Sequence, residues 1–183
     1  MRELQVPVNH LFQGIFCRKC ENKVPFQDMN MNAGIPLKRT DFQGQNLLGI
    51  DYGKKRTGLA TFKIGSDPYP LPYGVIKNQT DHNLIKQICA IIQQEDVDHI
   101  VLGLPLYLDG KKSDMTKVVL KFKDILAKSF KGQIFLQDEG LTSHEAELRM
   151  KDDPRYNFKV DKDHLDALAA SIILEDFLNQ LIA

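Results

Sequence analysis

The chain has 183 residues, of which 43% are hydrophobic and 26% are charged, as expected for one folded domain and not for a disordered or fibrous protein. The 24 basic and 24 acidic residues cancel, so any polyanion must be bound by a local patch or a metal ion. No apolar stretch approaches the roughly 20 residues that cross a bilayer, and three cysteines are too few for a disulfide framework. We therefore expect a cytoplasmic protein with no membrane contact.

Residues 1–45 differ from the rest of the chain. They mix prolines and glycines with many Asn and Gln residues and show no sustained hydrophobic period, which predicts an irregular N-terminal extension before a folded domain over residues 46–183. Cys17 and Cys20 form a single Cys-x-x-Cys pair. Four-ligand zinc sites usually contain two such pairs, so this pattern favours two reduced cysteines, with a zinc site as the alternative.

The first half of the predicted domain reads as three short strands and a helix. Residues 47–51 form an apolar run that ends in a carboxylate before a turn, which is typical of a buried strand. Residues 57–62 can return beside it as a hairpin partner, and residues 73–76 give a third strand. Apolar residues then recur at helical spacing after Thr80 or Asp81, either of which can cap the helix.

The second half alternates strands and helices. Residues 99–104 form another buried strand, which Pro105 stops, and Ser113 or Asp114 can begin the next helix. The remaining predicted elements are a strand over 133–137, a short helix opened by the capping box of residues 142–145, and a final helix from about 163 to 181.

This order of elements predicts the fold class. Three leading strands suit an antiparallel meander, whereas the later strand–helix–strand units require parallel pairing. The result is a three-layer α/β/α domain with a mixed five-stranded sheet, strands one to three antiparallel and strands four and five parallel. This is the layout of a ribonuclease H-like domain.

Several carboxylates fall at positions that such a sheet brings together. Asp51 ends the first strand, Glu139 follows the last strand, and Asp163 and Asp166 share one face of the final helix. Clustered carboxylates repel one another unless a cation relieves them, and Mg²⁺ prefers oxygen ligands. Two such ions about 4 Å apart can activate a water and stabilise the leaving oxygen of a phosphodiester. Taken singly, Glu139 could instead be a solvated loop residue, and Asp163 could simply complement the helix N-terminus.

A basic run, Lys54, Lys55 and Arg56, directly follows the first strand. An isolated run of this kind is usually a solvated turn, but beside a metal site it could hold the phosphates of a nucleic acid. His144 and His164 could shuttle protons, although surface histidines are common at such helical positions.

Four segments resemble the motifs of the YqgF/RuvX family. Residues 49–60 (GIDYGKKRTGLA) are similar to its opening signature, and residues 101–110 are similar to its GLPLxxDG segment. Residues 138–142 (DEGLT) and 166–174 resemble its DERLT motif and its C-terminal helix. The resemblance covers roughly residues 46–180 and implies a ribonuclease H-like nuclease that processes the 5′ end of pre-16S ribosomal RNA. It places the catalytic acids on Asp51, Glu139 and Asp166.

The resemblance also implies cofactors and partners, and leaves rival functions open. It implies two Mg²⁺ or Mn²⁺ ions held by Asp51, Glu139 and Asp166, to which helical spacing adds Asp163, and a structured RNA substrate bound by a monomer or weak homodimer. The alternatives are a resolvase acting on branched DNA, which would work as a dimer, and a nucleic-acid-binding module without catalysis. Gly140 stands where the DERLT motif has arginine, which removes a charged donor that could grip a phosphate.

Overall fold

The computed structural model describes residues 37–106, 113–139, 142–154 and 159–181. Cys17, Cys20 and Gly140 lie outside these ranges, so the alternatives stated for them remain predictions. The elements in chain order are a 3₁₀ helix η2 (Arg39–Phe42), β1 (Asn46–Tyr52), β2 (Arg56–Lys63), β3 (Leu71–Lys77), α1 (Asp81–Gln94), β4 (His99–Leu104), α2 (Asp114–Leu126), β5 (Gln133–Asp138), α3 (Thr142–Asp152) and α4 (Lys162–Gln180).

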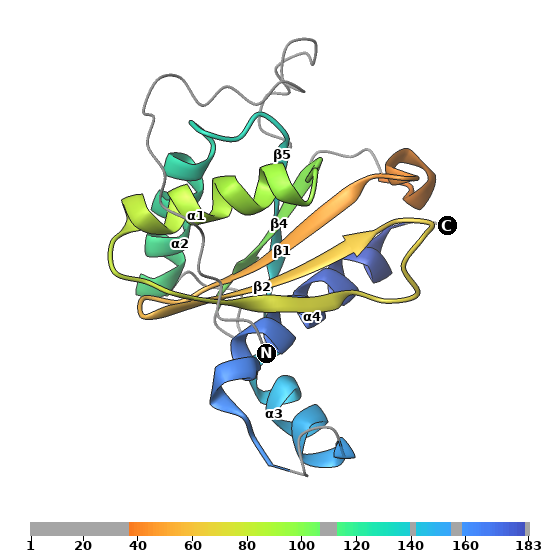
Figure 1. Ribbon diagram of the computed structural model, residues 1–183, viewed down its shortest axis with the longest axis vertical. Helices are drawn as coiled ribbons and strands as arrows, with labels where there is room; N and C mark the ends of the chain where they lie inside the picture. The colour runs from red at the N-terminus through yellow and green to blue at the C-terminus, as the bar shows by residue number, and fades with distance from the viewer. Residues whose placement is uncertain (1–36, 107–112, 140–141, 155–158, 182–183) are drawn as a thin grey trace.

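The sheet has the topology that the sequence predicted. Its five strands lie in the order β3-β2-β1-β4-β5, with β1–β2 and β2–β3 antiparallel and β1–β4 and β4–β5 parallel. Figure 1 shows α1 and α2 on one face of the sheet and α4 on the other, with α3 beside α4 beyond one end of the strands. The fold is therefore the predicted α/β/α arrangement. Within the described ranges, no helix combines the length and apolarity that a bilayer crossing requires.

Each face of the sheet carries its own apolar core. Leu48 and Ile50 of β1 point toward the core beneath α1 and α2, whereas Leu47 points toward α4. Because side chains alternate along a strand, Gly49 and Asp51 lie on the same face as Leu47. The last carboxylate of β1 is therefore directed toward α4 and away from the larger core.

The packing of the domain begins before residue 46. The ring of Phe42, at the end of η2, is only 3% exposed and belongs to the core beneath α4. Its centroid lies 5.7 Å from that of Phe135 and 6.2 Å from that of Phe177, in edge-to-face contacts. Residues that the sequence assigned to the extension thus contribute an aromatic side chain to the core.

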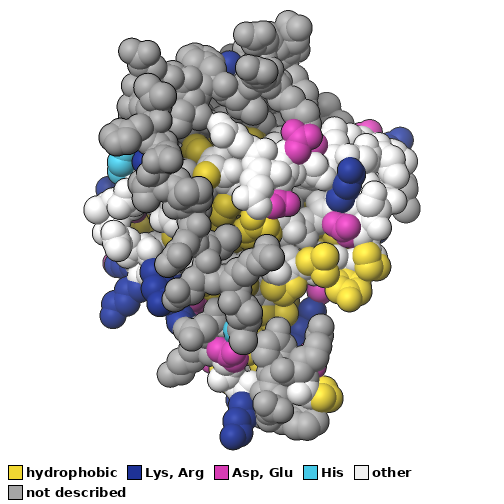
Figure 2. All heavy atoms as spheres, viewed as in Figure 1, with side chains coloured by type: hydrophobic (Ala, Val, Ile, Leu, Met, Phe, Trp, Pro, Cys, Tyr) yellow, Lys and Arg dark blue, Asp and Glu magenta, His cyan; other side chains and the backbone are white. Residues whose placement is uncertain are grey.

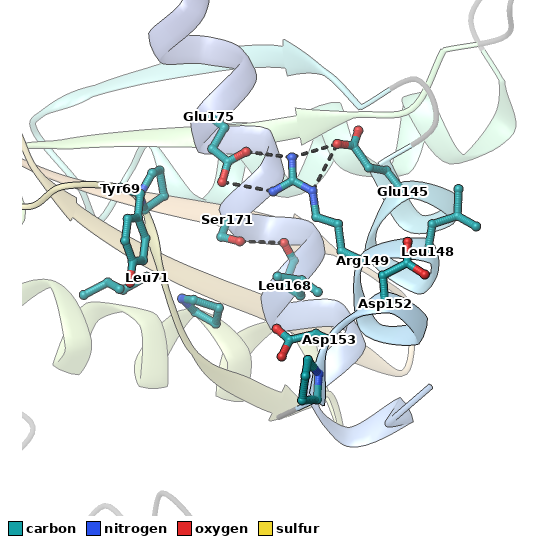
Figure 3. A pocket seen from close by; sticks show the side chains of 13 residues that line it. Tyr69, Leu71, Glu145, Leu148, Arg149, Asp152, Asp153, Leu168, Ser171 and Glu175 are labelled. Carbon is teal, nitrogen blue, oxygen red and sulfur yellow. Dashed lines mark hydrogen bonds and ion pairs between the residues drawn. The ribbon is translucent and has the colours of Figure 1, made fainter. Parts of the chain in front are cut away.

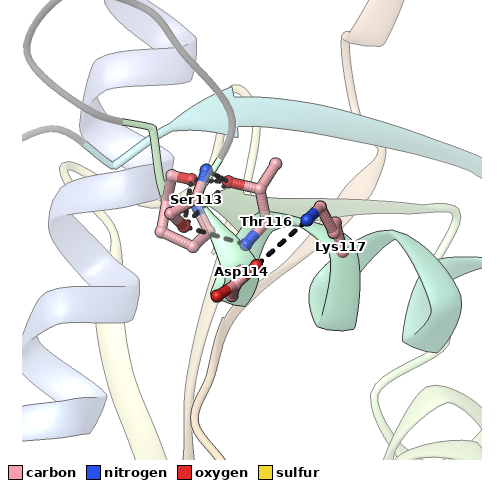
Figure 4. Close-up of polar contacts among 5 residues, drawn as sticks. Ser113, Asp114, Thr116 and Lys117 are labelled. Atoms are coloured by element: carbon pink, nitrogen blue, oxygen red, sulfur yellow. Dashed lines mark hydrogen bonds and ion pairs between the residues drawn. The ribbon is translucent and has the colours of Figure 1, made fainter.

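Helices α1 and α2 begin at predicted caps, whereas the side chain of Thr142, in the capping box predicted for α3, lies outside the described part of the structure. The Thr80 hydroxyl accepts a hydrogen bond from the Asn83 amide at the start of α1. At the start of α2, shown in Figure 4, Ser113 accepts from the Thr116 amide while the Thr116 hydroxyl accepts from the Ser113 amide. The buried Thr116 hydroxyl also donates to the Pro105 carbonyl, which ties α2 to the chain directly after β4.

Candidate active site

Asp51 stands near the carboxyl end of β1, on the face covered by α4. It pairs across the antiparallel ladder with Gly58 of β2. On the other side, the last β1–β4 pair, Ile50 with Leu102, brings Gly103 next to Asp51. The carboxylate therefore has a glycine on each neighbouring strand, and neither glycine has a side chain to fill the space above the sheet.

Gly103 leaves room for Glu139 to reach Asp51. The Glu139 amide donates to the Leu104 carbonyl at 3.3 Å, which continues the β4–β5 ladder one residue beyond β5. A Cβ added at Gly103 would lie 3.3 Å from Glu139 Oε2, so the Glu139 side chain passes directly over this glycine. Glu139 and Asp51 are joined by a hydrogen bond between their side chains.

Gly58 allows α4 to approach β2 closely, so that Asp166 lies near Asp51. A Cβ added at Gly58 would lie 1.8 Å from the Asp166 carbonyl oxygen, so α4 rests against the backbone of β2 at this residue. The Asp166 carboxylate is close enough to Asp51 for its charge to raise the pKa of Asp51. Three carboxylates from distant parts of the sequence thus lie near one another beside the C-terminal end of β1.

Burial and mutual repulsion raise the pKa values of two of these carboxylates. Burial raises the pKa of Asp51 to about 6, and the charge of Asp166 adds to this while the hydrogen bond from Glu139 opposes it. The pKa of Glu139 rises to about 8, first through burial and then through the charge of Asp51, the hydrogen bond to Asp51 and the charge of Asp138. At neutral pH, Glu139 therefore keeps its proton and donates it in a hydrogen bond to the ionised Asp51.

Arg56 lies at the carboxylate cluster and not in solvent. Its Nε is 2.8 Å from Asp166 Oδ2, and its side chain is 32% exposed. The sequence grouped Arg56 with Lys54 and Lys55 as a run that faces substrate, but only the two lysines are exposed in the turn between β1 and β2. Residue 56 is the first of β2, so strand pairing directs its side chain differently from those of the turn.

Asn78 holds this basic turn in place. Its side-chain amide donates to the Gly53 carbonyl at 2.5 Å and to the Thr57 hydroxyl at 2.9 Å. Its backbone amide donates to the Lys55 carbonyl at 2.8 Å. Both ends and the middle of the turn are thereby fixed by one residue after β3, which sequence reasoning missed because Asn78 is 21 residues beyond Thr57.

The donor set fits a hard divalent cation. Buried carboxylates that raise one another's pKa are stabilised when a cation replaces the shared proton. Gln137, two residues before Glu139 and 3% exposed, offers one more oxygen, since within the described ranges its Oε1 has no hydrogen-bond partner. In the described part of the chain, no three His, Cys, Asp or Glu side chains are already arranged around a common metal position. In this structure Asp51 is hydrogen-bonded to Glu139, and Asp166 is paired with Arg56.

The two histidine candidates do not join this cluster, and Asp163 cannot be placed in it. Asp163 lies in α4 three residues before Asp166, and its side chain lies outside the described part of the structure. His164 Nδ1 is 2.6 Å from Oδ2 of Asp161, the residue directly before α4, so it faces a carboxylate at the start of its own helix. His144 is exposed on α3. The structure thus brings together Asp51, Glu139 and Asp166, and gives neither histidine a place beside them.

Comparison with known sequences places these residues in a defined family. The sequence model of the RuvX family, described as "Holliday junction resolvase", matches residues 45–180. A protein of Maridesulfovibrio salexigens named "Putative pre-16S rRNA nuclease" is 39% identical over 135 residues, which cover 72% of this chain and 96% of the relative. A protein of the same name from Chlamydia abortus is 37% identical over 135 residues, covering 72% and 88% of the two chains.

Comparison with solved structures agrees on the fold. The Thermus thermophilus RuvC structure in complex with a Holliday junction substrate aligns with a TM-score of 0.51 at 11% sequence identity. The alignment covers 74% of this chain and 95% of the RuvC chain. At that identity the likeness concerns the ribonuclease H-like fold alone, and the sequence matches carry the assignment. The chain belongs to the RuvX family.

Proposed function

We propose that this protein is a divalent-metal-dependent endonuclease that hydrolyses phosphodiester bonds of structured RNA at the 5′ end of pre-16S ribosomal RNA. The observation that carries this proposal is the convergence of Asp51, Glu139 and Asp166 in one partly buried cluster. Membership of a nuclease family supports a hydrolase, and the names of the curated relatives support ribosomal RNA as substrate.

Each acidic residue has a distinct task in this proposal. Asp51, with carboxylates of other elements on both sides, would hold two cations together with Glu139 and Asp166, and Asp163 of α4 would add a further ligand. Bound Mg²⁺ or Mn²⁺ supplies an activated water and a counter-charge for the leaving oxygen. Because the pKa of Glu139 is raised, binding of a cation by its carboxylate would release a proton.

Basic residues bind the phosphates of the substrate in this proposal. Lys54 and Lys55 are exposed on a turn that Asn78 fixes, so they can contact successive backbone phosphates in a defined place. Arg56 balances the charge of Asp166 before metal binds. If Asp166 held a cation, the Arg56 guanidinium could turn toward a phosphate of the substrate.

The domain plan follows from the same reasoning. We propose that residues 46–183 form the nuclease domain, with η2 packed against it and residues 1–45 otherwise an added extension. Resolution of a DNA junction needs two coordinated cuts and hence a dimer. An RNA nuclease that makes one cut needs no second subunit, so we propose a monomer or weak homodimer. A precursor ribosomal RNA substrate would place its action in the cytoplasm.

The test is cleavage of two substrates. The purified protein is incubated with a pre-16S ribosomal RNA fragment and with a four-way DNA junction, each with Mn²⁺ and with EDTA. We expect Mn²⁺-dependent cleavage of the RNA, its loss in Asp51→Asn, and wild-type activity in Asp124→Asn, a matched change of an exposed carboxylate on α2. Cleavage by Asp51→Asn at the wild-type rate would remove Asp51 from the mechanism.

The second candidate is resolution of DNA junctions, favoured by the description of the family model. Paired, symmetric cuts in the four-way junction, together with a dimer in solution, would select this function. Uncut junctions and a monomeric protein would select the RNA nuclease.

A further inference from the structure

A groove of about 570 Å³ lies between α3 and the segment that leads into β3. Its walls are the β2–β3 loop with the start of β3 on one side and α3 on the other, and α4 forms its floor, as Figure 3 shows. None of Asp51, Glu139 and Asp166 lines it. The groove is thus a separate surface from the candidate active site.

Large hydrophobic side chains gather at this groove. Four are exposed in the described part of the chain, and three of them line the groove: Tyr69 (55% exposed), Leu71 (41%) and Leu148 (47%). Tyr69 and Leu71 stand on one wall and Leu148 on the other. Single exposed hydrophobic residues are ordinary, but a concentration on facing walls of one groove marks an interaction surface.

Negative charge accompanies these apolar side chains. Four carboxylates and one guanidinium line the groove, and Glu145 and Glu175 both engage that guanidinium, Arg149, at 2.7 and 2.8 Å. Next to them, burial together with the charges of Glu145 and Glu175 raises the pKa of Asp176 despite the opposing charge of Arg149. Figure 2 shows acidic, basic and hydrophobic side chains close together on the right of the view. The groove therefore carries an excess of negative charge.

We propose that this groove docks a basic protein segment whose apolar side chains fit between Tyr69, Leu71 and Leu148. Phosphates would meet a like charge here, and the one arginine already engages two glutamates, so the surface is unsuited to nucleic acid. Lysine or arginine side chains of a partner would complement the carboxylates.

Side chains, not strand pairing, make this contact. β3 is an edge strand of the sheet, but Pro72 within it has no amide hydrogen to donate to an added strand, and Pro70 directly precedes it. A partner would therefore contact the side chains of Tyr69 and Leu71 and not the backbone of β3. The nuclease chemistry does not depend on this contact, so either proposal can fail alone.

The test uses three labelled 14-residue peptides and fluorescence anisotropy on the full chain. The first peptide alternates lysines with leucines in a helical amphipathic pattern, the second replaces its leucines with serine, and the third replaces its lysines with glutamate. We expect micromolar binding of the first and at least tenfold weaker binding of the other two. Equal binding of the leucine–glutamate peptide would overturn the charge argument, and equal binding of the lysine–serine peptide the apolar one.

Variants locate the binding site. The double variant Tyr69→Ser, Leu148→Ser should weaken binding of the lysine–leucine peptide about tenfold or more. Ile125→Ser is the matched control, because Ile125 is the fourth exposed large hydrophobic residue and lies on α2, across the sheet. Asp152→Lys, an exposed site outside the Arg149 ion pairs, should weaken binding without removing any apolar contact.

Three outcomes contradict the proposal. Unchanged peptide binding in both the double variant and Asp152→Lys would place the peptide elsewhere. A dimer of the wild-type chain that the double variant dissociates, in sedimentation without peptide, would make a second copy the occupant. Weaker binding of single-stranded RNA by the double variant than by Ile125→Ser would make the groove a nucleic-acid surface.

Discussion

Replacing Glu139 with glutamine should flatten the pH dependence of stability of the metal-free protein. In the unfolded chain Glu139 ionises near its ordinary pKa of 4.5, whereas in the folded protein its pKa is about 8. Between these values the folded state binds more protons than the unfolded state, so the stabilisation is complete below pH 4.5 and falls as pH rises toward 8. A glutamine amide keeps a donor for Asp51 but has no proton to lose.

The size of the effect follows from proton linkage. One proton held only by the folded state changes the free energy of unfolding by about 1.4 kcal/mol per pH unit. Between pH 6 and pH 8 the wild-type protein should lose about 2 kcal/mol of stability more than Glu139→Gln, since the curve levels off near the folded pKa. Urea denaturation in EDTA at pH 6, 7 and 8 measures this, and the titration of groups that do not contact Glu139 cancels in the difference between the two proteins. Parallel stability curves for the two would refute the raised pKa of Glu139.

Three further changes test how the fold holds the site. Gly58→Ala would place a methyl group 1.8 Å from the Asp166 carbonyl oxygen, so we expect α4 to shift, with a loss of about 1–3 kcal/mol in urea denaturation and weaker Mn²⁺ binding. Asn78→Ala removes two hydrogen bonds that hold the basic turn, so it should lower the affinity for RNA in a filter-binding assay and leave Mn²⁺ binding unchanged. An unchanged affinity for RNA would argue against a fixed turn. Phe42→Ala should lower the free energy of unfolding by about 3–5 kcal/mol, and a loss below 1 kcal/mol would show that η2 is dispensable.

The sheet and the meeting of the carboxylates could be predicted because both follow from local patterns. Strand and helix periods fixed the element order, and the parallel pairing of β1, β4 and β5 forces their C-terminal ends to one edge. Asp51 and Glu139 stand at or just beyond two of those ends. Asp166 was predictable because its motif places it near the start of the helix that covers them.

Details of contact could not be predicted, because they depend on which groups face each other across the fold. Gly58 and Gly103 look like ordinary strand glycines in the sequence, yet one admits the backbone of α4 and the other the side chain of Glu139. Arg56 adjoins two solvent-facing lysines in the sequence, yet strand pairing turns it to Asp166. Phe42 sits in a segment without periodicity, so only the packed structure reveals its place in the core.

Titration of Mn²⁺ into the apoprotein by calorimetry measures whether Asp51, Glu139 and Asp166 share a cation. At pH 7.5 the wild-type chain should bind Mn²⁺ and release the Glu139 proton, which appears as a dependence of the binding heat on the ionisation enthalpy of the buffer. Asp51→Asn should fold normally and lose this uptake. Equal Mn²⁺ binding by Asp51→Asn, or no binding by the wild-type chain, would contradict a shared cation site at Asp51, Glu139 and Asp166.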